Sequence, residues 1–194
     1  MPERPVAPAL LIIDMQNDFA DPGTRLYSSH ALQIVTVINE LTHIARIKRI
    51  PVIWVVQQHR RQLVDFGREG DISPVHCVEG SYGAELISAL KVEASDFTVI
   101  KRRYSAFYAT DLDLLLRCLN RNMVILTGIA TDGCVQATAL DAQARDYYVR
   151  VVRDATATGS QTAHEAALVA MGRMQPGVVI SLEEALNQIN DREV

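Results

Sequence analysis

Short apolar runs that alternate with longer amphipathic segments constrain the fold of this chain more than any other feature. The runs are rich in β-branched residues and cover 9–13, 52–56, 97–100, 124–126, 149–152 and 178–180. Strands that are apolar on both faces are typical of a parallel sheet whose crossover helices pack on its two sides. The sequence therefore predicts a three-layer αβα, doubly wound, Rossmann-like α/β domain with a mostly parallel sheet.

The segments between these runs predict the helices that cover the sheet. One apolar stripe at helical spacing stops before Pro51 and comprises Leu32, Val35, Ile38, Leu41 and Ile44. We expect further helices around 86–90, from capping boxes at 110–113 and 181–184, from Cys134 onward, and over 162–174. Residues 57–80 are polar and irregular, which is typical of a long functional loop. Because no repeat or linker interrupts this order, we expect a single domain over 1–194.

Composition and charge exclude several classes of partner. The 194 residues are 48% hydrophobic and carry a net charge of −4, and no basic cluster is longer than Lys101-Arg102-Arg103. We therefore expect no nucleic-acid surface, and the early apolar run at 9–13 is far too short to cross a membrane. Three cysteines cannot all pair, and residues 1–5 lead no signal-like segment, so we expect a cytoplasmic protein.

Three chemically active side chains follow predicted strands directly. They are Asp14 after the first run, Lys101 after the third and Cys134 shortly after the fourth. In doubly wound sheets, sites gather at the carboxyl ends of the strands. We therefore expect these three residues to meet in one active site.

Cys134 is the candidate nucleophile because it begins an alanine-rich helical pattern after a short turn. The positive end of a helix dipole favours the thiolate, which is the reactive form of cysteine. A free cysteine is also often a small buried hydrophobe, as we expect for Cys118. A third reading is a non-catalytic domain in which Cys134 is an oxidisable, redox-sensing thiol.

Asp14 and Lys101 could complete the chemistry of Cys134. A carboxylate can take the thiol proton and return it to a leaving amine, and a nearby ammonium favours both anions. The plain alternatives are an aspartate that orders its loop and a lysine in a solvated basic run. The backbone N–H groups of the turn at 128–133 could face a developing oxyanion, or could form an ordinary helix entry capped by Thr131 or Asp132.

The remaining candidates are two loop histidines and three aromatic residues. His59 and His76 could face a cleft together with Gln57, although glutamine is a poor metal ligand. Phe19, Tyr104 and Phe107 could line an apolar substrate pocket, or could be ordinary core aromatics.

Three motifs together resemble those of the isochorismatase-like cysteine hydrolases, which include nicotinamidases, N-carbamoylsarcosine amidases and ureido-type amidases. The motifs are DMQNDF at 14–19, KRRYSAF at 101–107 and GIATDGCV at 128–135, and the resemblance extends from Leu10 to about Leu186. It implies that Asp14 is the general base and acid, Lys101 its electrostatic partner and Cys134 the nucleophile of a thioester-like acyl-enzyme.

The resemblance also implies an oxyanion hole and the position of a cis peptide. The hole would consist of the backbone N–H groups of Ala130 and Cys134, and the cis bond would join Ile129 to Ala130. Relatives often assemble into oligomers, so we expect a homo-oligomer. Because Cys134 is present, the resemblance favours cleavage of a C–N bond in a small-molecule amide over vinyl-ether hydrolysis.

The loop at 57–80 departs from the nicotinamidase pattern. His59 and His76 stand where nicotinamidases bind their metal, but Gln57 replaces the expected aspartate and so removes the only anionic ligand of that pattern. We therefore expect an amidohydrolase of a carbamoyl, ureido or nicotinamide-like substrate that requires no cofactor. The alternative within the family is a metal-dependent nicotinamidase with zinc or another divalent ion at His59 and His76.

Overall fold

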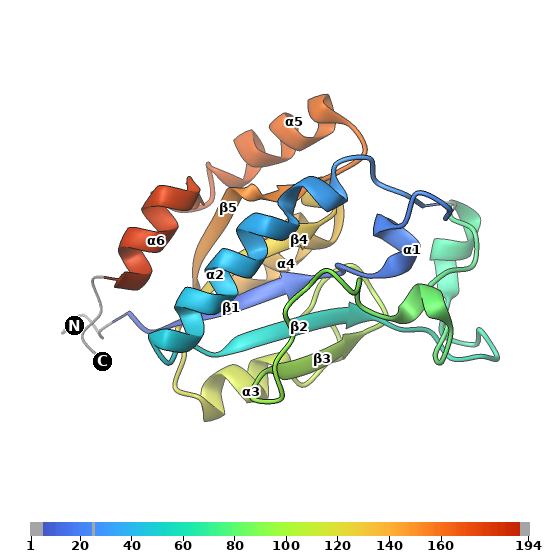
Figure 1. The fold of residues 1–194 in the computed structure, drawn as a ribbon, viewed down its shortest axis with the longest axis horizontal. Helices are drawn as coiled ribbons and strands as arrows, with labels where there is room; N and C mark the ends of the chain where they lie inside the picture. The colour runs from blue at the N-terminus through green and yellow to red at the C-terminus, as the bar shows by residue number, and fades with distance from the viewer. Residues whose placement is uncertain (1–5, 25, 191–194) are drawn as a thin grey trace.

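The computed structural model describes residues 6–24 and 26–190 and places six parallel strands in one sheet (Figure 1). The strand order is β3-β2-β1-β4-β5-β6. The bounds are β1 Pro8–Ile13, β2 Val52–Gln57, β3 Phe97–Lys101, β4 Met123–Ile129, β5 Tyr148–Ala157 and β6 Val179–Ile180. The predicted doubly wound α/β fold is confirmed. Residues 1–5, on which the expectation of no signal segment depends, lie outside the described residues.

The helices cover both faces of this sheet. They are α1 Asn17–Ala20, α2 Val35–Ile47, α3 Leu112–Cys118, α4 Gln136–Gln143, α5 Gln161–Met171 and α6 Leu182–Asn190. Leu10 and Ile12 of β1 pack in one core with residues of α2 and α6, whereas Leu11 and Ile13 pack in a second core with residues of α3, α4 and α5. Alternate side chains of a strand point to opposite faces, so β1 must be apolar at every position. Among the described residues, no helix combines the length and apolar character needed to cross a membrane.

The helix expected around 86–90 does not form, and that prediction is wrong. Leu86 pairs with Gln16 in an isolated antiparallel bridge, and Ile87 N–H donates to Met15 O at 3.1 Å. The Gln16 side chain donates to Ala84 O at 2.7 Å. Backbone groups of this segment thus bond to residues 15–17 rather than to a helix. The apolar spacing reflects contact with the core, where Ile87 and Leu90 are buried.

The two predicted capping boxes have different outcomes. At the start of α6, Ser181 N–H donates to Glu184 Oε2 at 2.7 Å, and Glu184 N–H donates to Ser181 Oγ at 3.2 Å, which confirms the box. Before α3, Thr110 Oγ1 accepts from Leu112 N–H, but Asp113 pairs with Arg117 instead of returning to Thr110. The second box is therefore incomplete.

Gly128 in β4 lets the strand approach the end of β1, where Asp14 begins. Its φ is +101°, and a Cβ at this position would lie 2.1 Å from Ile13 O. We expect Gly128→Ala to lower the free energy of unfolding by about 3 kcal/mol or more, since backbone strain and overpacking cost roughly 1–3 kcal/mol each. Urea denaturation would measure this. Gly159→Ala is the matched control, because its Cβ would meet nothing within 4 Å; equal losses in the two variants would contradict the argument.

Candidate active site

The sheet brings Asp14, Lys101 and Cys134 together, as the strand-end rule predicts. The arrowheads of β1, β2 and β3 point to the same end of the molecule in Figure 1. Asp14 follows β1 directly, Lys101 is the last residue of β3, and Cys134 lies in the tight turn Thr131–Val135 between β4 and α4. Lys101 Nζ lies 2.7 Å from Asp14 Oδ2 and donates to Cys134 Sγ at 3.3 Å. All three side chains are buried, with exposures of 1%, 0% and 8%.

Burial and the neighbouring charges shift the pKa values of all three side chains. Burial raises the pKa of Cys134, and the adjacent Asp14 carboxylate raises it further, although the Lys101 ammonium opposes both. Burial also raises the pKa of Asp14 against the opposing effect of Lys101. Burial lowers the pKa of Lys101, but the charges of Asp14 and Cys134 more than offset this, so its pKa lies above the ordinary value. In the resting site, Asp14 and Lys101 thus form an ion pair at 2.7 Å, and burial favours the protonated thiol at Cys134 over the thiolate that the helix dipole alone would favour.

The raised pKa of Cys134 predicts slow alkylation in the resting protein. The iodoacetamide reaction requires the thiolate, so its rate at Cys134 should keep increasing above pH 9, beyond the range near ~8.5 where an ordinary thiol titrates. Peptide mapping of carbamidomethylated Cys134 over pH 6–10, with N-acetylcysteine as reference, would measure it. A rate that levels off below pH 8 would contradict the assignment.

The turn that carries Cys134 is fixed by its own hydrogen bonds. Ala130 O accepts from Gly133 N–H at 3.0 Å and from Val135 N–H at 3.1 Å. The peptide bond between Ile129 and Ala130 is cis, as the resemblance implied. The Thr131 hydroxyl pairs with His164 Nδ1 at 2.9 Å, so it does not cap α4, which begins at Gln136.

A cavity of about 520 Å³ opens onto this turn. Asp14, Ala130 and Cys134 line it, together with Phe19 and Tyr104 of the expected aromatic set. Phe107 does not line it. That ring is buried in the core with its centroid 5.6 Å from that of Tyr147, because its segment turns inward before α3. The prediction that Phe107 binds substrate is therefore wrong.

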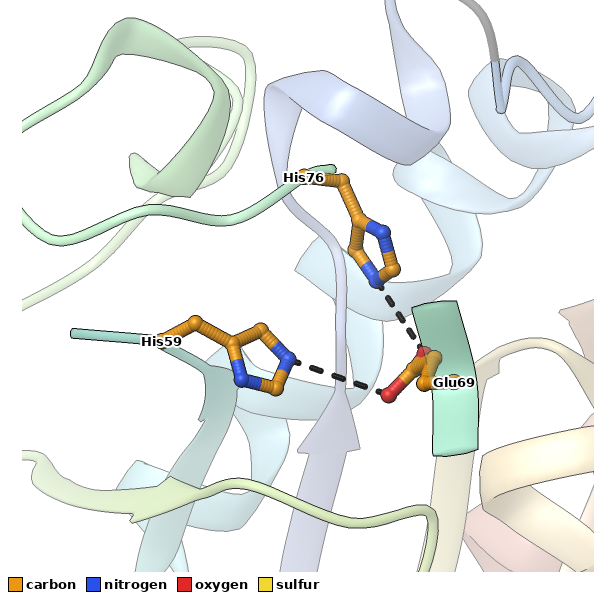
Figure 2. A group of neighbouring side chains, drawn as sticks. All are labelled: His59, Glu69 and His76. Carbon is orange, nitrogen blue, oxygen red and sulfur yellow. Dashed lines mark ion pairs between the residues drawn. The ribbon is translucent and has the colours of Figure 1, made fainter. Parts of the chain in front are cut away.

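His59 and His76 both face Glu69 in the loop that follows β2 (Figure 2). Glu69 Oε1 is 3.2 Å from His76 Nε2, and Glu69 Oε2 is 3.7 Å from His59 Nε2. One ligand atom from each residue can be chosen so that all three lie within 4.8 Å of one another, so the group has the composition of a metal site. The expectation that Gln57 leaves the histidines without an anionic ligand is wrong, because Glu69 supplies a carboxylate.

The pKa values of the two histidines are shifted in opposite directions. Burial lowers the pKa of His59. Burial also lowers the pKa of His76, but its hydrogen bond to Glu69 and the Glu69 charge more than offset this, so the pKa of His76 is raised. Glu69 and His76 line the cavity, and the cluster therefore borders the space in front of Cys134.

The comparisons with known proteins assign the chain to a family. The family model described as an isochorismatase domain matches residues 8–184. The chain belongs to the isochorismatase family.

Relatives of this isochorismatase-family chain include amidohydrolases. A probable inactive nicotinamidase of Arabidopsis thaliana is 37% identical over 180 residues, which cover 88% of this chain and 91% of that protein. A ureidoacrylate amidohydrolase of Methylobacterium radiotolerans is 31% identical over 187 residues, covering 84% and 72%. A pyrazinamidase of Pyrococcus horikoshii in complex with zinc superposes with a TM-score of 0.82 at 29% identity, covering 90% and 98%.

Sequence reasoning missed one residue of the site, Glu69, and one contact, that of Gln57 with Lys101. Glu69 lies in the short 3-10 helix Gly67–Asp71, and no periodicity signals its approach to His76. Gln57 is the last residue of β2 and is 1% exposed, with its side-chain oxygen 3.0 Å from Lys101 Nζ. The position of Gln57 at a strand end, next to those of Asp14 and Lys101, was the available signal.

Proposed function

We propose that this chain hydrolyses a small non-peptide amide through an acyl-enzyme on Cys134 and releases ammonia or an amine. The observation that carries the proposal is the position of Lys101 Nζ, which contacts both Asp14 Oδ2 and Cys134 Sγ, two residues that line a cavity. The substrate classes are carbamoyl, ureido and nicotinamide-like amides. The names of the amidohydrolase relatives support this range.

The first half-reaction follows from the resting charges. Asp14 takes the proton from Cys134, and the thiolate forms a C–S bond to the amide carbon while the carbonyl electron pair moves to oxygen. The backbone N–H groups of Ala130 and Cys134 bind this oxyanion. The electron pair then returns, the C–N bond breaks, and Asp14 gives its proton to the departing nitrogen.

The second half-reaction uses the same groups. Asp14 removes a proton from water, the resulting hydroxide attacks the thioester carbon, and the C–S bond breaks to release the acid product. The sulfur recovers the proton held by Asp14. Lys101 stays protonated throughout and stabilises whichever of Asp14 and Cys134 is anionic. Phe19 and Tyr104 border the substrate in this scheme.

We propose that the protein consists of one domain, acts in the cytoplasm and forms a homo-oligomer. The three cysteines are free, which suits a reducing compartment. The exposed side chains of Ile72 and Tyr108 lie around a second cavity that shares Glu69 and Tyr104 with the first, and they offer apolar contact area to another copy.

An ammonia-release screen tests the proposed activity. It would compare nicotinamide, N-carbamoyl amino acids, biuret and ureido compounds, each with and without a chelator. We expect turnover of at least one of these amides, unchanged by the chelator. Failure of every amide to release ammonia from protein with an intact, alkylatable Cys134 would favour the redox-sensing alternative.

A further inference from the structure

The centre of the His59–Glu69–His76 cluster is the place where a metal ion would sit. A divalent ion bound by histidine and carboxylate ligands lies about 2.0–2.2 Å from each donor atom, so it needs the point that all donors face. His76 Nδ1 lies 2.7 Å from Pro74 O, and a carbonyl only accepts, so Nδ1 carries the hydrogen. The other ring nitrogen, Nε2, faces the centre and lies 3.2 Å from Glu69 Oε1.

In this structure, the centre of the cluster is taken by an amide nitrogen. Gln57 Nε2 lies 3.0 Å from His59 Nε2 and 3.1 Å from His76 Nε2. It also lies 3.0 Å and 3.1 Å from the two carboxylate oxygens of Glu69. A side-chain N–H₂ group offers two donors and no metal-binding lone pair. The residues present therefore do not fit a metal while Gln57 keeps this position.

The opposite end of the same amide is held by Lys101. Gln57 Oε1 accepts from Lys101 Nζ at 3.0 Å. An ammonium has donors only, so a flipped amide would set N–H₂ against N–H₃⁺ and would lose this bond. Lys101 thus fixes which atom of Gln57 points into the cluster.

Two hydrogen bonds with the Gln16 side chain also hold the backbone of Gln57. Gln57 N–H donates to Gln16 Oε1 at 2.8 Å, and the Gln16 side-chain amide donates back to Gln57 O at 2.8 Å. Gln57 is 1% exposed, and these two bonds fix its backbone at the end of β2.

We propose that the Gln57 side-chain amide replaces a metal ion. Its nitrogen lies at the point that His59, Glu69 and His76 face, where its two hydrogens can bond to two of the surrounding atoms at a time, and its oxygen ties this cluster to Lys101. The native cluster then binds no divalent cation. Gln57→Asp would convert it into a metal site, because the substitution removes the central donors and adds a carboxylate. This inference concerns metal binding and stands apart from the proposed amidase activity.

Zinc titration calorimetry on the full chain tests the proposal. We expect no one-to-one Zn²⁺ binding by the wild type. Gln57→Asp should bind one Zn²⁺ per chain, with affinity raised by more than ~100-fold, since even partners outside the ligand set are worth roughly 10–100-fold. Gln58→Asp is the matched control, because it adds the same charge one residue outside the cluster, and it should bind like the wild type.

Two results would overturn the proposal. One is a wild type that binds one Zn²⁺ as tightly as Gln57→Asp and loses it in His76→Ala. The other is an equal gain of affinity in Gln58→Asp. Should Gln57→Asp not fold, Gln57→Ala provides the test without a new charge. That variant removes the amide from the centre of the cluster and should bind Zn²⁺ more tightly than the wild type. An unchanged Zn²⁺ affinity would show that the Gln57 amide is not what prevents metal binding.

Discussion

Replacing Cys134 with alanine is expected to reduce kcat for amide hydrolysis by at least ~10⁴-fold, the scale seen when a covalent nucleophile is removed. The physical reason is that no other group can form the acyl-enzyme at this position. Cys134 lies in the cavity lining, with its sulfur 3.3 Å from Lys101 Nζ. Ammonia release on the substrate found in the screen would measure the loss.

Cys118→Ala is the matched control for this variant. Cys118 is the exposed last residue of α3, so the expectation that it is buried is wrong, and its replacement should leave kcat unchanged. Full activity in Cys134→Ala, with unaltered folding, would remove the nucleophile from the scheme. Loss of activity in Cys118→Ala as well would indicate damage to the fold rather than to the chemistry.

Lys101→Met is expected to affect both activity and stability. Removing one partner of a buried ion pair costs about 3–5 kcal/mol, because the other charge is left without compensation. Lys101 is 0% exposed and is the ammonium that opposes the raised pKa of Asp14. Without it, Asp14 should be protonated near neutral pH and unable to act as a base, so kcat should fall by roughly 10²–10⁴-fold.

The stability of Lys101→Met should also depend on pH in a defined direction. Its folded state would bind a proton on Asp14 that the unfolded chain releases above pH ~4. Stability therefore falls as pH rises through the raised folded pKa, and urea unfolding should give a lower free energy at pH 8 than at pH 5, relative to the wild type. Arg103→Met removes an exposed cation two residues away and should show no such slope. A pH-independent Lys101→Met would contradict the account of the ion pair.

The sheet could be predicted from the sequence because burial on both faces leaves a plain signal. The run at 9–13 is apolar at every position, and in the structure its residues alternate between two cores. The segment at 86–90 has a similarly clear helical spacing, but Ile87 N–H donates to Met15 O and Leu86 pairs with Gln16 in a β-bridge. Those bonds come from residues some 70 positions earlier, so local periodicity could not reveal them.

The catalytic candidates could be predicted where the fold alone positions them. Asp14 directly follows β1 and Lys101 is the last residue of β3, so the parallel topology brings both to the same end of the sheet whatever conformation the loops adopt. Glu69 belongs to a loop, and its contact with His76 depends on a turn without periodic sequence. Phe107 shares a motif with Lys101, yet its segment turns away from the cavity into the core. Motif membership therefore did not determine the direction of its side chain.

The central claim is that Cys134 carries the acyl group of the substrate. Rapid acid quenching during turnover, followed by intact-mass and peptide mass spectrometry, tests it most directly. The account predicts a mass increase equal to the acyl group on the peptide that contains Cys134, absent in Cys134→Ala and present in Cys118→Ala. Steady turnover with no adduct on Cys134, in a protein whose Cys134→Ala variant still hydrolyses the amide, would contradict it.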